Sequence, residues 1–257
     1  MTQGLKTIDL NERGSVLIVQ DGDALARRAA EEIIAASNLA KGESRAALVA
    51  LSGGSTPKKM GELLATPAYS ERVAWDHLQL FWGDERFVPL ASEESNAGEA
   101  LRAFIDEAPI HPDDVHTWDT NDGITPAESA RRYGQAIREV ADSGSDVPVF
   151  DLVLLGMGDD GHTLSLFPDT AAIHNNEEIV VAHHVEKLNA DRVTFTPLLA
   201  NAARKVVFLV GGAGKAEMLQ RVLEGEIDVD TLPSQVIRPA GDLTWLVDEA
   251  AASKLEQ

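Results

Sequence analysis

The sequence has 257 residues and no cysteine, which excludes a disulfide framework and a thiolate zinc site. No stretch approaches the run of about 18 apolar residues that spans a membrane. The first ten residues carry one lysine and no apolar segment of the length found in secretory signals. We therefore expect a cytoplasmic protein that has no membrane partner.

Basic residues are scarce, with 22 Lys and Arg against 42 Asp and Glu, so the formal net charge is −20. Such a charge repels nucleic acid and anionic membranes, and we expect no nucleic-acid partner. A small anionic substrate would need a local cluster of basic side chains. Hydrophobic residues make up 44% of the chain, which is typical of a folded protein, and we expect residues 1–257 to form a single domain.

Short apolar segments rich in β-branched residues alternate with longer segments of helical period. The predicted strands are Val16–Val19, Ala46–Leu51, Leu78–Trp82, Asp151–Leu155, Ile179–Ala182, Val206–Val210 and Leu243–Val247. The predicted helices are Asp23–Ala40, Pro57–Leu64, Asn96–Ile105, Ala127–Val140 and Ala213–Leu223.

Several of these strands are apolar on both faces, which suits a parallel sheet covered by helices on both sides. The sequence therefore predicts an α/β fold of three α/β/α layers, Rossmann-like, with a mostly parallel central sheet. Segment Ala108–Ala127, rich in Pro, Asp and Thr, is predicted to be an excursion on the surface. Ligands of such sheets lie beyond the carboxyl ends of the strands, so a functional site is expected in the loops there.

The segment from Ser52 to Pro57 reads Ser-Gly-Gly-Ser-Thr-Pro and joins a predicted strand to a predicted helix. We expect a Ser or Thr cap there, with Pro57 at the first helical position. Glycines allow a close approach of the backbone, and the helix N-terminus adds partial positive charge. The pattern favours a phosphate site on Gly53, Gly54 and Ser55; a tight turn without a ligand is the alternative.

Charged side chains follow the predicted strand that ends at Trp82. Asp84, Glu85 and Arg86 lie in a row there, and Arg86 is suited to bind phosphate through two parallel hydrogen bonds. A surface ion cluster is the alternative. Lys215 lies at another strand end, and we interpret it as a phosphate ligand, since the residues around it do not match a nucleotide-binding loop.

His162 follows three closely spaced glycines at the end of a buried predicted strand. A neutral imidazole there is suited to take a proton from water, and either Asp159 or Asp160 would orient it. A structural histidine is the alternative. The other histidines lack a matching carboxylate pattern, so no metal site is expected.

Taken together, these motifs resemble those of the 6-phosphogluconolactonase family, in the same order and at the same spacing. The matching segments are Ser52–Pro57, Trp82–Arg86, Gly156–Thr163, Arg192–Thr196, Gly214–Lys215, Leu232–Ser234 and Gly241–Trp245. The resemblance covers most of the chain. It implies a fold like that of sugar-phosphate isomerases and hydrolysis of 6-phospho-D-glucono-1,5-lactone to 6-phospho-D-gluconate, in the oxidative pentose phosphate pathway.

The resemblance also implies a role for each motif. His162 would be the general base, helped by Asp160, and the phosphate would bind Gly53, Gly54, Ser55, Arg86 and Lys215. Asp84 and Arg192 are further candidates for substrate binding, although Asp84 is expected to serve structure more than chemistry. Neither a metal nor a cofactor is implied. The expected partner is the sugar phosphate lactone, bound by a monomer or a small homo-oligomer.

Two alternatives remain. Glucosamine-6-phosphate deaminases are similar in fold and also have an Asp-Gly-His loop. They typically have Asp-Glu-Tyr, however, where this chain has Asp84, Glu85 and Arg86. They also have Asn-Glu-Pro where this chain has Leu166–Pro168. A non-catalytic sugar-phosphate sensor would carry a DNA-binding module, and this acidic chain has no basic recognition helix.

Overall fold

The computed structural model describes residues 6–121, 123–141 and 144–256. Its centre is a seven-stranded sheet in the order β1-β2-β10-β9-β6-β3-β4. Neighbouring strands are parallel throughout, except that β1 pairs antiparallel with β2. The strands are β1 Lys6–Asp9, β2 Ser15–Val19, β3 Ala47–Leu51, β4 Leu78–Trp82, β6 Leu152–Leu155, β9 Lys205–Val210 and β10 Asp242–Asp248. The predicted fold class is confirmed.

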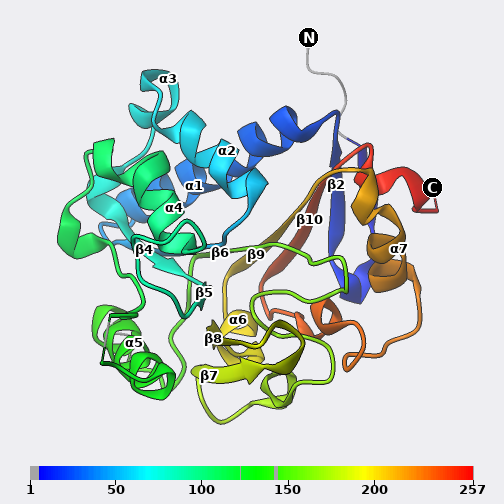
Figure 1. Ribbon diagram of the computed structural model, residues 1–257. Helices are drawn as coiled ribbons and strands as arrows, with labels where there is room; N and C mark the ends of the chain where they lie inside the picture. The colour runs from blue at the N-terminus through cyan, green and yellow to red at the C-terminus, as the bar shows by residue number, and fades with distance from the viewer. Residues whose placement is uncertain (1–5, 122, 142–143, 257) are drawn as a thin grey trace.

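Helices cover both faces of this sheet (Figure 1). Helices α1 (Gly22–Gly42) and α2 (Ser55–Leu64) pack together on one face, and α7 (Ala216–Glu224) lies on the other. The central strands β3 and β6 are buried along their whole length, as strands between two helical layers must be. No helix in the described part of the chain is long and apolar enough to cross a membrane.

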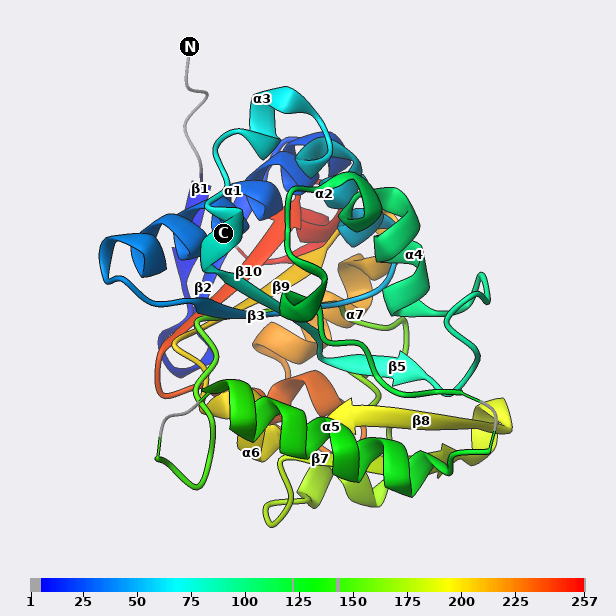
Figure 2. The same ribbon diagram turned by 90° about the vertical axis from the view of Figure 1, so that its left-hand side faces the viewer.

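A second, smaller sheet has three antiparallel strands in the order β5-β8-β7. Its strands are β5 Asp84–Arg86, β8 Ala190–Phe195 and β7 Val180–Val185, and helix α5 (Pro126–Ala141) packs across β7 and β8 (Figure 2). The sequence predicted only the beginning of β7. Strands β5 and β8 were missed because charged residues interrupt their apolar pattern.

Two predicted helix ends differ in the structure. Helix α2 begins at Ser55, its N-cap is Gly54, and no side chain caps it, so the predicted Ser or Thr cap and the first helical position for Pro57 are wrong. Gly54 has a φ of 110°, which glycine adopts freely and which allows the helix to begin earlier than predicted. Helix α4 (Asn96–Ala103) stops before Phe104, whose ring packs directly on Gly61.

The segment from Ala108 to Ala127 is not the surface excursion that its composition predicted. Trp118 is only 2% exposed, and its ring stacks on that of Tyr133 with 3.7 Å between the ring centroids. Its indole N–H donates a hydrogen bond to the carbonyl of Trp82 at 3.1 Å. Trp118 therefore joins this polar segment to the core, together with Val115, which bridges to Leu80 of β4, and His116, whose ring stacks on that of Phe81.

We expect Trp118→Ala to lower the free energy of unfolding by about 3 to 5 kcal/mol, the usual cost of truncating a buried aromatic side chain. His111→Ala in the same segment is the control, because the His111 side chain is 69% exposed. Urea unfolding of both variants provides the measurement. Equal stability of the two variants would show that Trp118 is not part of the core.

Candidate active site

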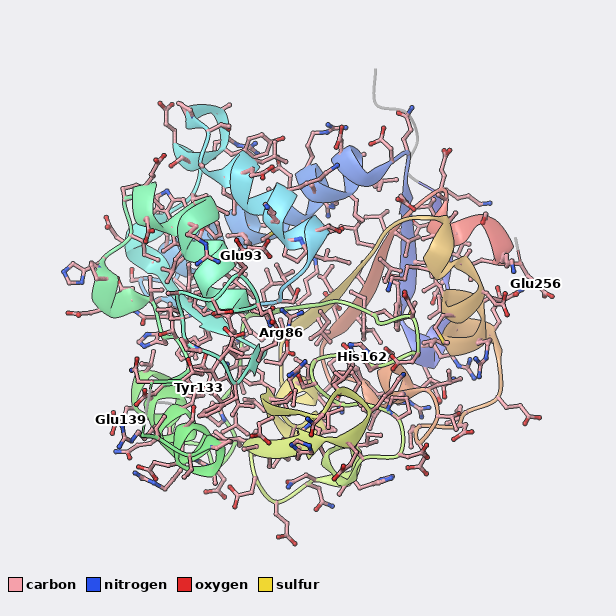
Figure 3. The ribbon with its side chains drawn as sticks, viewed as in Figure 1. Arg86, Glu93, Tyr133, Glu139, His162 and Glu256 are labelled. Carbon is pink, nitrogen blue, oxygen red and sulfur yellow. The ribbon has the colours of Figure 1, made fainter. Side chains whose placement is uncertain are left out.

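A cavity of about 740 Å³ opens beyond the carboxyl ends of the parallel strands. Its lining includes Gly53, Gly54, Asp84, Arg86, Asp159, Asp160, His162, Arg192 and Lys215. Of the residues that the sequence nominated, Ser55 alone is outside this lining; it is exposed in the first turn of α2. The labelled side chains of Arg86 and His162 lie near the middle of the view in Figure 3.

The imidazole of His162 is held by one carboxylate. Its Nδ1 lies 2.5 Å from Oδ1 of Asp160. Because an ionised carboxylate only accepts hydrogen bonds, a neutral imidazole here has its proton on Nδ1 and its lone pair on Nε2. The hydrogen bond with His162 holds the pKa of Asp160 well below its usual range, so this carboxylate stays ionised. The geometry therefore selects Asp160 over Asp159.

Gly158 makes this contact sterically feasible. A Cβ at position 158 would lie 2.1 Å from Nδ1 of His162 and 2.8 Å from Oδ1 of Asp160. Neither atom has room to remain where it is if a methyl group is added. The neighbouring Gly156 has open space around its Cβ position. Of the glycines before His162, Gly158 therefore has a steric reason to lack a side chain.

Arg86 and Arg192 are directly opposite each other on the paired strands β5 and β8. Both line the cavity, and neither forms a salt bridge within the described residues. Burial lowers the pKa of Arg192, and the neighbouring positive charge of Arg86 lowers it further. Two guanidinium groups that repel each other at one wall of a cavity form a suitable site for a dianion such as phosphate.

Glu85 is the centre of a buried hydrogen-bond cluster and not part of a surface ion cluster. Its side chain is 1% exposed and accepts hydrogen bonds from the backbone N–H groups of Arg86, Asn96 and Ala97 and from the Ser95 hydroxyl. Burial raises the pKa of Glu85, and these donors oppose the rise. Glu85 thus fixes β5, which carries Arg86, to the N-terminus of α4.

Two other nominated residues have partners of their own. Asp84 is 9% exposed, and its Oδ2 accepts a hydrogen bond from the Ser165 hydroxyl at 2.7 Å. The ammonium of Lys215 lies 2.5 Å from Oδ1 of Asp159. Asp84 therefore ties β5 to the loop that carries His162, while Lys215 presents its charge at the rim of the same cavity.

Among the cavity residues that sequence reasoning did not nominate are Asn96 and Lys187. Asn96 places its side chain against Gly53, where a Cβ would lie 1.8 Å from its Oδ1, so the first glycine of the Ser52–Pro57 loop is needed for this contact. Lys187 donates a hydrogen bond to Oδ2 of Asp160 at 3.0 Å. No motif signals Lys187, because it lies on the turn between β7 and β8, far from Asp160 in the sequence.

The cavity differs in charge from the rest of the molecule. Its lining has four cations, Arg86, Arg192, Lys187 and Lys215, and three acids, Asp84, Asp159 and Asp160. The chain as a whole has a net charge of −20. An anionic ligand would therefore find local attraction here. Among the described residues, no group of three or more His, Cys, Asp or Glu side chains is arranged to hold a metal ion.

Comparison with known proteins assigns the chain to a family. Residues 20–245 match the family model described as glucosamine-6-phosphate isomerases/6-phosphogluconolactonase. A 6-phosphogluconolactonase of Nostoc sp. is 37% identical over 242 residues, which cover 94% of this chain and 98% of the relative. A human 6-phosphogluconolactonase is 39% identical over 237 residues, which cover 91% of this chain and 89% of the relative.

A solved structure supports the same assignment. The 6-phosphogluconolactonase from Trypanosoma cruzi superposes with a TM-score of 0.81 at 27% identity, covering 98% of this chain and 99% of that one. The fold and the cavity thus define an α/β enzyme class with its site at the carboxyl ends of parallel strands. The chain belongs to the glucosamine-6-phosphate isomerase/6-phosphogluconolactonase family.

We expect Gly158→Ala to separate the imidazole of His162 from Asp160, since the added methyl group has no room beside either. Gly156→Ala is the matched control, because its Cβ meets nothing within 4 Å. Nitrogen-15 NMR of the histidine side chains reports which ring nitrogen carries the proton. The wild type and Gly156→Ala should show His162 protonated on Nδ1. The same state in Gly158→Ala would contradict the steric argument.

Proposed function

We propose that this protein hydrolyses 6-phospho-D-glucono-1,5-lactone to 6-phospho-D-gluconate, with His162 as the general base. The observation that carries the proposal is that one cavity holds the Asp160–His162 pair and the paired arginines Arg86 and Arg192. A base for water and a site for phosphate are the two parts that this reaction requires. The names of the curated relatives support the same substrate.

In the proposed mechanism, Nε2 of His162 takes a proton from a water molecule, which attacks the lactone carbonyl carbon C1. The tetrahedral oxyanion collapses, the bond between C1 and the ring oxygen breaks, and the ring oxygen receives the proton from Nε2. Asp160 stays ionised, keeps the proton on Nδ1 and stabilises the imidazolium that forms between the two steps. Besides the lactone and the water molecule, the proposed steps involve the side chains of His162 and Asp160.

The phosphate binds, in this proposal, between Arg86, Arg192 and Lys215 and the backbone N–H groups at the start of α2, from Gly53 to Ser55. The N-terminus of α2 contributes partial positive charge there. Ser55 would contribute its backbone and not its side chain. Anchoring at the phosphate holds C1 near His162, and such positioning supplies much of the acceleration in reactions of this kind.

We expect the wild type to accelerate loss of the lactone over its spontaneous opening. Arg86→Ala and Arg192→Ala should each raise KM about tenfold or more, because each removes a charge-assisted contact with phosphate. The value of kcat should change less than KM, because the remaining phosphate ligands still position C1 in the bound complex. Arg131→Ala is the control, since Arg131 pairs with Glu128 on the exposed side of α5. The phosphorylated lactone is generated from glucose 6-phosphate, and its loss is followed optically. Hydrolysis of gluconolactone, which has no phosphate, is measured in parallel.

The two lactones separate the outcomes. If the arginine variants lose the preference for the phosphorylated lactone while Arg131→Ala keeps it, the phosphate site is supported. An unchanged KM would remove that arginine from the site. No acceleration of either lactone, together with ammonia release from glucosamine 6-phosphate, would replace the proposed activity with that of a deaminase.

A further inference from the structure

Lys187 has no part in the mechanism above, yet it contacts the catalytic pair directly. It lies in the short turn Glu186–Leu188 between β7 and β8, and its side chain lines the cavity. Its ammonium donates to Oδ2 of Asp160 at 3.0 Å, while Oδ1 of the same carboxylate contacts Nδ1 of His162. Lys187 and His162 therefore contact the two different oxygens of one carboxylate.

The other three cations of the cavity lining have different places. Arg86 and Arg192 face each other on β5 and β8, and Lys215 pairs with Asp159. Among the cations that line the described cavity, Lys187 alone is hydrogen-bonded to the Asp160–His162 pair. On the β7–β8 hairpin, Arg192 pairs with His183, two pairs away from the last pair before the turn that holds Lys187. If phosphate binds the arginines, Lys187 is therefore the positive charge at the end where C1 reacts.

The proposed reaction creates a negative charge at that end. The lactone carbonyl is neutral, and an oxyanion forms at C1 during the reaction. Ring opening leaves a carboxylic acid at C1, which loses its proton to solvent and becomes a carboxylate. Asp160 stays ionised nearby, so an uncompensated carboxylate would be repelled by it. A cation next to Asp160 removes this repulsion.

Lys187 has the freedom to do so. Its side chain is 70% exposed, so the ammonium is not locked in place by packing. An ammonium group has three N–H donors, and Asp160 accepts one of them. A flexible lysine can therefore keep its contact with Asp160 and donate to a second carboxylate as well.

We propose that Lys187 binds the carboxylate that lactone opening creates at C1, as the counterpart of the arginines that bind the phosphate at the other end. This inference rests on the proposed lactonase function. It assigns the two ends of the cavity to the two anionic groups of the product, a phosphorylated sugar acid. It also makes Lys187 a determinant of how tightly the product is held.

The test compares the affinity of two phosphorylated ligands that differ only at C1. The ligand 6-phosphogluconate has a carboxylate there, and glucitol 6-phosphate has a hydroxymethyl group. Calorimetric titration of the wild type should give an affinity about tenfold higher for the acid, the size of one charge-assisted contact. Lys187→Gln should lose this preference and bind the acid no more tightly than glucitol 6-phosphate, with its affinity for glucitol 6-phosphate unchanged. Lys254→Gln is the control, because Lys254 pairs with Glu217 at the surface.

Equal weakening of both ligands by Lys187→Gln would overturn the inference, since Lys187 would then act on phosphate binding or on the fold. A preserved preference for the acid in that variant would overturn it as well. Lactone turnover by the wild type is measured in parallel. If the wild type hydrolyses the lactone but Lys187→Gln keeps its preference for the acid, this inference alone is refuted. If the wild type neither hydrolyses the lactone nor binds either ligand, the proposed function is refuted too.

Discussion

The proposed function depends first on the hydrogen bond between Asp160 and His162. In a neutral imidazole this bond places the proton on Nδ1 and the lone pair on Nε2, so Nε2 is the nitrogen that can accept a proton. The bond depends on a residue without a side chain at position 158, and the other oxygen of Asp160 is occupied by Lys187. Gly158 and the turn between β7 and β8 thus both support the position of the same carboxylate.

The sheet brings the rest of the site to that bond. Parallel strands place the loops after β3, β6 and β9 at one edge, and β5 continues from the same edge into the second sheet. Glu85, buried at the N-terminus of α4, holds β5 in place and with it Arg86. The pairing of β5 with β8 then sets Arg192 opposite Arg86. A basic wall forms in a strongly acidic protein because strand pairing brings together two arginines that are far apart in the sequence.

Much of this arrangement could be predicted from the sequence, because it follows from local pattern. Apolar strands such as Val206–Val210 and the glycine-rich loops after them determine the parallel sheet and the edge where the site lies. Contacts between distant segments could not be predicted in this way. The burial of Trp118 against Tyr133 depends on one side chain in a polar segment, and the contact of Lys187 with Asp160 depends on the pairing of β7 with β8. The choice of Asp160 over Asp159 required the position of the imidazole.

The most direct measurement of the central claim is lactone hydrolysis by His162→Ala, without and with added imidazole. The account predicts a loss of about 10²- to 10⁴-fold in kcat, the usual contribution of a general base. It also predicts partial recovery with imidazole, beyond the effect of imidazole on the lactone alone, while binding of 6-phosphogluconate persists. A folded His162→Ala protein that hydrolyses the lactone as fast as the wild type would contradict the assignment of His162 as the base.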